Sequence, residues 1–380
     1  MTWPSAVVNQ INQLQGRSRE IERTLLFIGH AGTSAPASTA LVALDSQSDI
    51  DAVLASADVG FIGNVRAAQL NGGQNWQAWA AVLPAGTDAA GFVTAIRDAQ
   101  DLISVEGVVI IRHGDMASRR AEVMGLQALR TELRNKYGRW LWFILGLPGI
   151  EKTQTWAAYL ADVATALTGV AAPGVQAVPV LWGTEAGVLA GRLCDRSVTV
   201  ADSPARVATG ALLGLEPSLP QDSTGAEVTL AILRALHDLR CSVPMWYADF
   251  EGYYWSDGLM LEVNGGDYQV IEHVRIMDKV SRNIRIQAIG KIGNRNLNTT
   301  PVSIETHKTF FGRTLRAMSR SVQINGVTFP GEIEPPDNKA VSIVWLSKEQ
   351  VSIGVVVRPH GCPKEITANI VLDTGLEVKG

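Results

Sequence analysis

Two glycine-containing turns are the segments best able to bind a phosphate group, because each follows a predicted strand. One is Gly29–Ser34, and the other is Gly149–Thr153, which resembles the end of a phosphate-binding loop. Neither has the glycine spacing of G-x-G-x-x-G or of G-x-x-x-x-G-K-[ST]. The sequence therefore favours ordinary strand-to-helix turns over a nucleotide site at both places.

Histidine, cysteine and serine could supply metal ligands or a nucleophile. The six histidines never pair at metal-ligand spacing, and no G-x-S-x-G motif is present. The three cysteines, Cys194, Cys241 and Cys362, are far apart and indicate reduced thiols. His113–Asp115 follows a predicted strand, where a capping turn is the favoured interpretation. We expect no catalytic residue, no cofactor and no metal.

The composition and length predict a folded protein of two or three domains, and the lack of a signal peptide or membrane-spanning run predicts that it stays in the cytoplasm of the cell making it. The chain has 380 residues, of which 46% are hydrophobic and 18% are charged. Its N-terminus, Met1–Gly16, is too polar for a signal peptide. The longest apolar run, Trp140–Leu147, is too short to cross a membrane.

The pattern along the chain predicts three regions: an arm at residues 1–20, an α/β domain at 21–240 and a region of different character at 241–380, which the resemblance described below implies is an assembly domain. In the second region, short apolar runs alternate with longer helical patterns, which is typical of a Rossmann-like fold with a largely parallel sheet. The predicted strands are Thr24–Ile28, Gly107–Arg112, Leu141–Leu145 and Val178–Trp182. The predicted helices are Asp88–Leu102, Met116–Tyr137, Thr153–Leu167 and Ala226–Arg240.

The third region is predicted to be β-rich with two basic helices. Asp257–Val274 suggests a hairpin that leads into a helix over about 269–291. Thr300 and Pro301 supply an N-cap and a proline at the first helical position, opening a helix that runs to about Arg320. Period-two alternation predicts strands at Val341–Leu346, Val351–Arg358 and Ile366–Leu372.

The basic residues gather in one stretch of this region. Asp267–Arg320 holds ten Lys or Arg residues against four acidic ones, in a chain whose formal charge is −4. Two stripes result, one of Arg275, Lys279 and Arg282 and one of Arg313, Arg316 and Arg320. The pI of about 5.9 and the lack of interleaved aromatic residues argue against nucleic acid. An acidic protein surface is the better partner.

The two ends of the chain share a structural problem. Ser5–Leu14 is strand-compatible, and so is the C-terminal end, yet each exposes unpaired backbone groups unless some sheet accepts it. Addition of each strand to a neighbouring subunit satisfies these groups. If donor and acceptor are different surfaces, the assembly is a ring or a helical filament.

The chain resembles the contractile-tail sheath proteins of myophages. The resemblance is carried by PSAVVNQINQLQGRSREIERTLLFIG near the start, by GGDYQVIEHVRIMDKVSRNIRIQAIGKIGNRNLNTTP, by the basic helix that follows and by the β-rich end. It implies strands exchanged between neighbours, stacked hexameric rings and an assembly domain beside a tail tube. Contraction then drives the tube through the host envelope.

Carried onto this sequence, the resemblance assigns residues to two roles. The exchanged strands would contain Val7, Val8, Ile11, Ile366, Ile370 and Leu372. The surface facing the tube would contain Arg275, Lys279, Arg282, Arg313, Arg316 and Arg320. Reversing the charge of Arg275, Lys279 and Arg282 is then expected to leave folding intact and to weaken attachment to the tube.

The resemblance also implies partners and a location. The partners are further copies of the chain, the tail tube protein, and the baseplate and tail-terminator proteins, with no direct nucleic acid contact and no membrane insertion. The location is the virion tail, after assembly in the host cytoplasm. Two alternatives stay open: another tail or baseplate protein, and a nucleotide-binding α/β enzyme. The particle itself could be a phage or a phage-derived bacteriocin.

Overall fold

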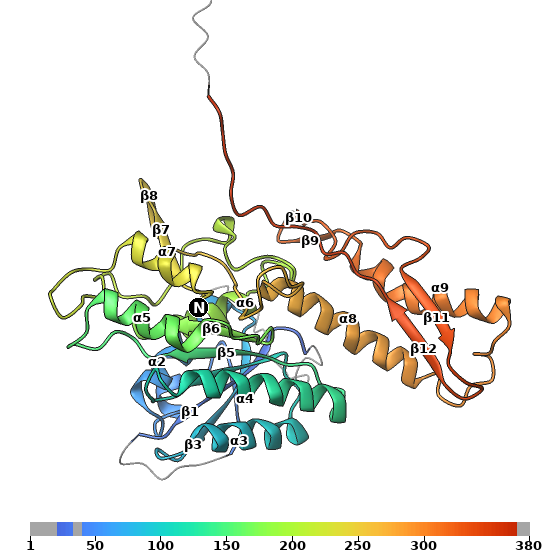
Figure 1. The fold of residues 1–380 in the computed structure, drawn as a ribbon, viewed down its shortest axis with the longest axis horizontal. Coiled ribbons are helices and arrows are strands. Elements are labelled where there is room, and N and C mark those ends of the chain that lie inside the picture. Colours follow the sequence, from blue (N-terminus) through green and yellow to red (C-terminus); the bar gives the residue numbers. More distant parts are fainter. Residues whose placement is uncertain (1–20, 33–39, 371–380) are drawn as a thin grey trace, which may run out of the picture.

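A computed structural model of the chain describes residues 21–32 and 40–370. The predicted N-terminal arm with Val7, Val8 and Ile11 lies outside the described residues, as does Leu372. Figure 1 shows a body built on a sheet, with a second, elongated part extending from one side of it.

The body contains a six-stranded sheet with the strand order β2-β3-β1-β4-β5-β6. Its strands are β1 (Thr24–His30), β2 (Val42–Asp45), β3 (Gln77–Leu83), β4 (Gly107–Ile111), β5 (Trp142–Leu147) and β6 (Val175–Pro179). Every neighbouring pair is parallel except β2 with β3. All of β1 is buried, as expected of a parallel strand that is covered on both faces.

Helices cover both faces of the sheet. One face carries α1 (Ile50–Val53), α2 (Val59–Gly72) and α6 (Glu185–Cys194), and the other carries α3 (Ala89–Leu102), α4 (Arg119–Glu132), α5 (Trp156–Leu167) and α7 (Leu230–Asp238). Alternate residues of β1 point to the two cores: Leu25 and Phe27 to the first, Leu26 and Ile28 to the second. Short helical turns lie at Leu133–Tyr137 and Val207–Thr209. The predicted mixed α/β fold with a parallel-strand sheet is confirmed.

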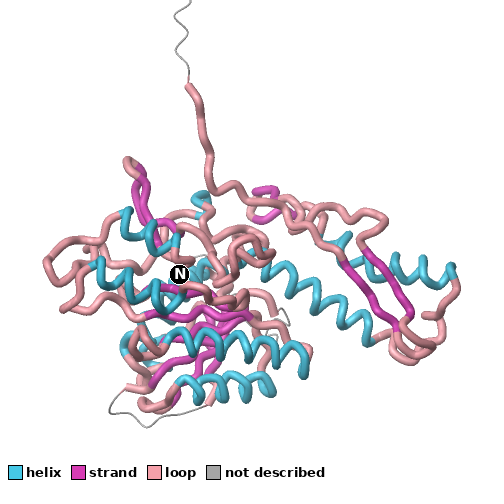
Figure 2. Tube along the Cα trace, viewed as in Figure 1, coloured by secondary structure: helices cyan, strands magenta, loops and turns pink. Residues whose placement is uncertain are grey.

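The elongated part is formed by helix α8 (Ile271–Ile289), helix α9 (Pro301–Met318) and two hairpins (Figure 2). The hairpins are β9–β10 (Val322–Ile324, Val327–Phe329) and β11–β12 (Val341–Trp345, Val351–Val355). Both helices lie where the sequence predicted them, and the hydroxyl of Thr300 accepts the backbone N–H of Ser303 as the predicted N-cap. A third hairpin, β7–β8 (Pro244–Tyr247, Phe250–Trp255), projects from the body.

Helix α8 links the two parts because its ends belong to different cores. Ile271 and Val274 pack with α2 and α6 in the body. Beginning only two residues later, Ile276 and Val280 pack with Phe311 of α9. The orientation of the elongated part therefore depends on how α8 is held against the body.

The C-terminal third differs from its sequence prediction in three ways. It is mixed rather than β-rich, since α8 and α9 are its longest elements. The hairpin predicted in Asp257–Val274 is reduced to one isolated bridge between Leu259 and Val270. Residues 366–370 of the strand predicted at Ile366–Leu372 form no strand within the single chain, and pairing of this segment with a neighbouring subunit stays a prediction. A single extended segment has no second strand beside it in one copy of the chain, so no ladder forms.

Candidate functional site

Two of the six histidines lie at or just after the carboxyl ends of β1 and β4. His30 is buried, and its Nε2 lies 3.0 Å from the carbonyl oxygen of Thr87. Its ring stacks on that of His113, with centroids 5.6 Å apart. His113 lies 3.3 Å from the carboxylate of Asp58, the N-cap of α2. Within residues 21–32 and 40–370, no three His, Cys, Asp or Glu side chains are placed to hold a metal ion.

The Gly149–Thr153 turn borders a cavity of about 420 Å³ between α4 and α5. The charged residues that line it are Asp115, Arg120, Glu151 and Asp162. This mostly acidic lining repels phosphate, which argues against a nucleotide there. Asp115 accepts the backbone N–H of Ser118 at 2.9 Å, which closes a turn just before α4, whereas the N-cap of that helix is Ser118 itself. Hydrogen bonds from Ser118 hold the pKa of Asp115 below its usual value.

A buried ion pair fixes α8 to the body. Nε and Nη2 of Arg275 lie 2.7 and 2.9 Å from the two carboxylate oxygens of Glu106, which directly precedes β4. Glu106 also accepts the backbone N–H of Arg23 at 2.6 Å. Burial favours the neutral acid, but the charge and hydrogen bonds of Arg275 and this N–H hold the pKa of Glu106 below its usual value. Both members of the pair therefore stay ionised.

Three more charged residues of α8 have partners elsewhere in the chain. The pairs are Asp278 with Arg130 at 2.8 Å, Lys279 with Glu332 at 2.6 Å, and Arg282 with Glu22 at 2.9 Å. Burial raises the pKa of Asp278, and the charge of Arg130 opposes that shift. Together with Arg275–Glu106, these contacts attach α8 to the start of β1, to β4, to α4 and to the segment after β10.

The α8 stripe is thus not the free basic surface that helical spacing suggested. Arg275 is 2% exposed and Arg282 is 9% exposed, and both form ion pairs within the chain. The reason is that α8 lies between two packed parts, so its polar face is covered and needs acidic partners. Contact of these three cations with a tube stays a prediction.

Reversing Arg275, Lys279 and Arg282 to glutamate is now expected to prevent folding, contrary to the sequence-based expectation. Each new carboxylate faces an existing one, and two of the three sites are buried. Circular dichroism and solubility of the triple variant measure this outcome. A soluble variant with the native spectrum contradicts the structural role of the pairs.

The second predicted stripe does lie on a surface. Arg313 and Arg316 are exposed on one side of α9, and Arg320 is exposed just after the helix ends at Met318. Arg313 lies over the ring of Phe310, and Arg316 donates to the carbonyl oxygen of Thr309. None of the three arginines pairs with a carboxylate of residues 21–32 or 40–370. Their charges are available to a partner.

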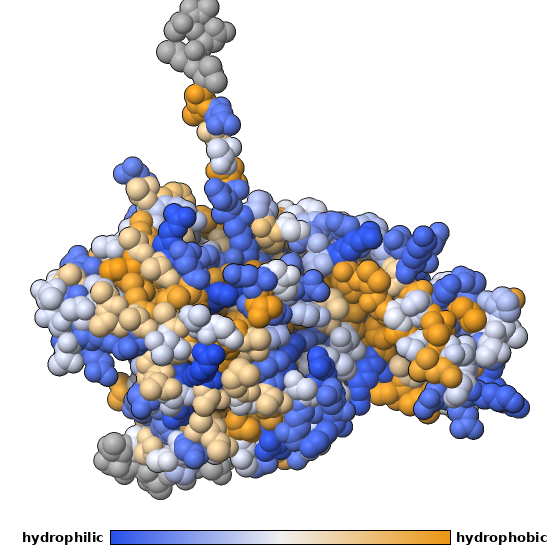
Figure 3. Space-filling view, viewed as in Figure 1, coloured by the Kyte–Doolittle hydropathy of each residue, from blue (hydrophilic) through white to orange (hydrophobic). Residues whose placement is uncertain are grey.

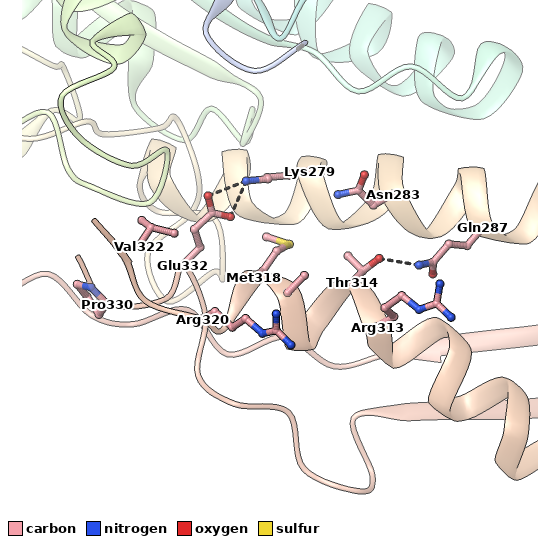
Figure 4. Close-up of a pocket in the computed structure, with 11 residues that line it drawn as sticks. Lys279, Asn283, Gln287, Arg313, Thr314, Met318, Arg320, Val322, Pro330 and Glu332 are labelled. Atoms are coloured by element: carbon pink, nitrogen blue, oxygen red, sulfur yellow. Dashed lines mark hydrogen bonds and ion pairs between the residues drawn. The ribbon is translucent and has the colours of Figure 1, made fainter. Parts of the chain in front are cut away.

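A groove of about 420 Å³ lies between α8 and α9, next to this stripe. Figure 4 shows Arg313 and Arg320 along its α9 side and Lys279 of α8 across from them. Lys279 is bound to Glu332, the acidic residue in the lining. The groove keeps a net positive charge, which suits an acidic segment of a partner.

Hairpin β11–β12 forms a two-stranded sheet on its own. Val341 and Ile343 are buried on its α9 side, and Val344 is exposed on the opposite side. Figure 3 shows hydrophobic side chains gathered over the elongated part. The exposed ones in this region include Ile286, Ile289, Ile292, Val302, Val344 and Leu346. A surface of this composition marks a protein interface.

The last described segment leaves the molecule as an extended chain (Figure 1). Ile366 and Ile370 are 83% and 95% exposed. They are spaced by four residues, so they lie on one side of the chain when it is a strand. Two large apolar residues in such a place need a binding partner. Among the described residues, no helix combines the length and the apolar character needed to cross a membrane.

Sequence reasoning missed the acidic partners of α8. The signal was weak: Glu106 is a single acid before the apolar run of β4, and Glu22 and Glu332 lie in polar surroundings. Arg130, the basic partner of Asp278, lies in the predicted helix Met116–Tyr137, but the sequence gave no reason to single it out. Periodicity within α8 identifies its cations but says nothing about acids that lie far away in the sequence.

Comparison with known proteins gives matches over nearly the whole chain. The family model described as DUF2586, N-terminal domain, matches residues 3–259, and DUF2586, C-terminal domain, matches residues 267–375. A protein of Haemophilus phage HP1 (strain HP1c1), named "Putative tail sheath protein", is 48% identical over 376 residues, which is 98% of each chain.

Solved structures share the fold at low sequence identity. The sheath of an extracellular contractile injection system, the PVC sheath complex in its contracted state, matches with a TM-score of 0.64 and 14% identity over 98% of both chains. The contracted helical sheath of the anti-feeding prophage gives 0.60 and 14%, over 98% of this chain and all of the other. A sheath tail protein of Desulfitobacterium hafniense gives 0.56 and 10%, over 93% and 96%.

Proposed function

This chain belongs to the family of tail sheath proteins, and we propose that it polymerises into stacked hexameric rings around a tail tube. Contraction of the polymer then drives the tube through the host envelope. Its partners are further copies of the chain, the tube protein, and the baseplate and terminator proteins. It works in the virion tail after assembly in the host cytoplasm, and it is not an enzyme.

The observation that carries this proposal is hairpin β11–β12, whose two outer edges are unpaired within residues 21–32 and 40–370. Leu346 donates to Gln350, and Val356 donates to Ala340, so even-numbered residues bond across the hairpin. Antiparallel pairs alternate, so the odd-numbered residues point their N–H groups outward. Each edge is a template onto which another strand can add.

We propose that two segments of the chain become strands when they add to these edges on neighbouring subunits. At one end are Val7, Val8 and Ile11, and at the other are Ile366, Ile370 and Leu372. A net contribution of about 1 kcal/mol per interchain hydrogen bond is small, but it repeats at every contact of the polymer. Donor and acceptor are different surfaces, so the contact is heterologous, and its repetition builds rings or a helix.

The finer description of the fold is part of the same proposal. We divide the chain into a strand-donating arm (1–20), a Rossmann-like α/β domain (21–240) and an assembly domain (241–380) with an extended C-terminal arm. The parallel strand order β3-β1-β4-β5-β6 supports the Rossmann-like description. The buried pairs of α8 support a subunit that moves as a rigid body during contraction.

Electron microscopy tests the proposed polymerisation into tubes. Electron microscopy of the purified protein at high concentration, with and without its tube protein, should show tubes. A protein that stays monomeric under both conditions contradicts it.

Tube attachment is assigned to Arg313, Arg316 and Arg320. Changing all three to glutamate should leave the fold and self-assembly intact, because these side chains are exposed, and should abolish binding to the tube at physiological salt. Each exposed pair contributes only about 0.2–1 kcal/mol and is screened by salt, so wild-type attachment should also weaken as salt rises. Co-sedimentation with assembled tube measures both effects.

The control is a variant in which three exposed cations of the body are changed to glutamate, namely Arg134, Lys152 and Arg234. It should bind the tube as the wild type does. If both triple variants lose binding equally, total charge matters and the α9 stripe does not. If the α9 variant instead loses self-assembly, the stripe is a contact between sheath subunits.

A further inference from the structure

The C-terminal segment binds the body again before it leaves the molecule. After β12, Pro359 forms an isolated bridge with Ile333, and the thiol of Cys362 lies 3.8 Å from the carbonyl oxygen of Ala201. The ammonium group of Lys364 then contacts the carboxylates of Asp257 and Glu272, the latter at 2.9 Å. Asp257 follows β8, and Glu272 is in the first turn of α8.

Lys364 compensates charges that the body cannot easily bury alone. Asp257 is 7% exposed and Glu272 is 3% exposed, and one oxygen of Glu272 has no hydrogen-bond partner among the described residues. Burial raises the pKa of Glu272, and the charge of Lys364 opposes that shift. Removing the cation leaves two neighbouring carboxylates in a buried site, which is strongly unfavourable.

The chain changes character directly after this contact. Residues 363–370 are all exposed and have no secondary structure, but the side chain of Lys364 is only 29% exposed and forms the last ion pair along the described chain. Figure 2 shows this segment extending away from the molecule. The boundary between the fixed and the free chain therefore lies at Lys364.

We propose that Lys364, Asp257 and Glu272 form a latch that keeps the root of the C-terminal arm on its own subunit, so that the strand given to a neighbour begins after Lys364. This rests on the proposed strand exchange. The segment that follows the N-terminal arm is held on the same helix. Glu22 forms an ion pair with Arg282 of α8. The backbone N–H of Arg23 donates to Glu106, which in turn pairs with Arg275 of α8. Helix α8 is then the common anchor of both arms.

Cys362 is a built-in reporter of the latch in the free protein. It is partly exposed, whereas Cys194 and Cys241 are buried and their pKa values are raised by burial. The Lys364→Met variant should raise the rate at which a thiol reagent labels Cys362 by about tenfold or more, because charged hydrogen bonds no longer hold the segment. Burial raises the pKa of Cys362 and the charge of Lys364 opposes that shift, so loss of this charge alone would slow labelling. A faster rate therefore reports release.

Three variants complete the test. Lys364→Arg keeps a cation and should label about as slowly as the wild type. Lys348→Met removes an exposed lysine from the β11–β12 turn and should change nothing. The triple variant Asp257→Asn, Glu272→Gln, Lys364→Met buries no uncompensated charge, so it should fold and still label fast. Wild-type labelling rates in the folded triple variant overturn the latch.

The assembled state separates this proposal from strand exchange itself. In wild-type polymer, Cys362 should stay as slow to react as in the monomer, because the latch remains closed while residues beyond it are exchanged. Faster labelling on polymerisation overturns the latch even though the polymer forms. Absence of any polymer counts against the proposed function, and the monomer measurement then still decides the latch.

Discussion

Replacing Glu106 with glutamine is expected to lower the free energy of unfolding by about 3–5 kcal/mol, the usual cost of removing one member of a buried ion pair. Glutamine preserves the size of the side chain but leaves Arg275 buried without a counter-charge. Urea denaturation followed by circular dichroism measures the loss. Because Arg275 holds α8, the variant should also assemble poorly.

The matched control is Glu305→Gln, since Glu305 pairs with Lys308 on the exposed side of α9. Its cost should stay below about 1 kcal/mol. A double variant, Glu106→Leu with Arg275→Met, removes both charges and should recover much of the loss. Equal losses for the two glutamine variants contradict the role assigned to Glu106.

The same pair should leave a signature in the pH dependence of stability. The pKa of Glu106 is held below its ordinary value of 4.5, so its contribution to stability is complete above pH 4.5 and is lost as the pH falls through the lower folded value. The difference in stability between the wild type and Glu106→Gln should therefore shrink on acidification below pH 4.5. The pH dependence contributed by Asp278 has the opposite sign. Burial raises the pKa of this carboxyl, so its contribution to stability is lost as the pH rises.

Removing residues 1–14 is expected to give a folded monomer that forms no polymer. The deletion removes Val7, Val8 and Ile11, the apolar residues of the strand that we propose is donated, while every described residue of the fold is kept. Sedimentation velocity and negative-stain microscopy measure the outcome. Normal tubes from the deletion variant refute the donated strand.

Two further experiments test whether the strand itself matters. In the full chain, Val8→Pro should block polymerisation, since proline cannot donate within a strand pair, whereas Gln15→Pro, outside Ser5–Leu14, should not. A free peptide of residues 1–14 should inhibit wild-type polymerisation by occupying the open edge of β11–β12. The same peptide with Val8→Pro should have no effect.

The fold could be predicted wherever local pattern determines it. The uninterrupted apolar run of β1 and the Thr300–Pro301 start of α9 each specify their element from a few neighbouring residues. Strand β3 was missed because QAWAAVL has too many alanines to resemble a strand. Helix α2 was missed because its apolar residues are spread around the helix among glycine and asparagine.

The site could be predicted only in part, because its contacts join distant residues. The partners of Arg275 and Arg282 lie 169 and 260 positions away, so no spacing rule within α8 can find them. Spacing did identify the α9 stripe, whose three arginines are exposed as one set. Alternation predicted the strands of hairpin β11–β12, but it did not predict that the two outer edges of this hairpin stay unpaired within residues 21–32 and 40–370, because an open edge is defined by a missing neighbour.

The position of Lys364 gives a distance rule for the assembled particle. Only Glu365 separates it from Ile366, and an extended chain advances about 3.3 Å per residue. If pairing begins at Ile366, the exchanged strand begins within about 7 Å, measured along the chain, of the backbone of Lys364, whose side chain contacts the first turn of α8. This short distance between Lys364 and the start of the exchanged strand must be the same before and after contraction. In a density map of either state, the start of α8 is therefore the reference point from which the neighbouring subunit can be located.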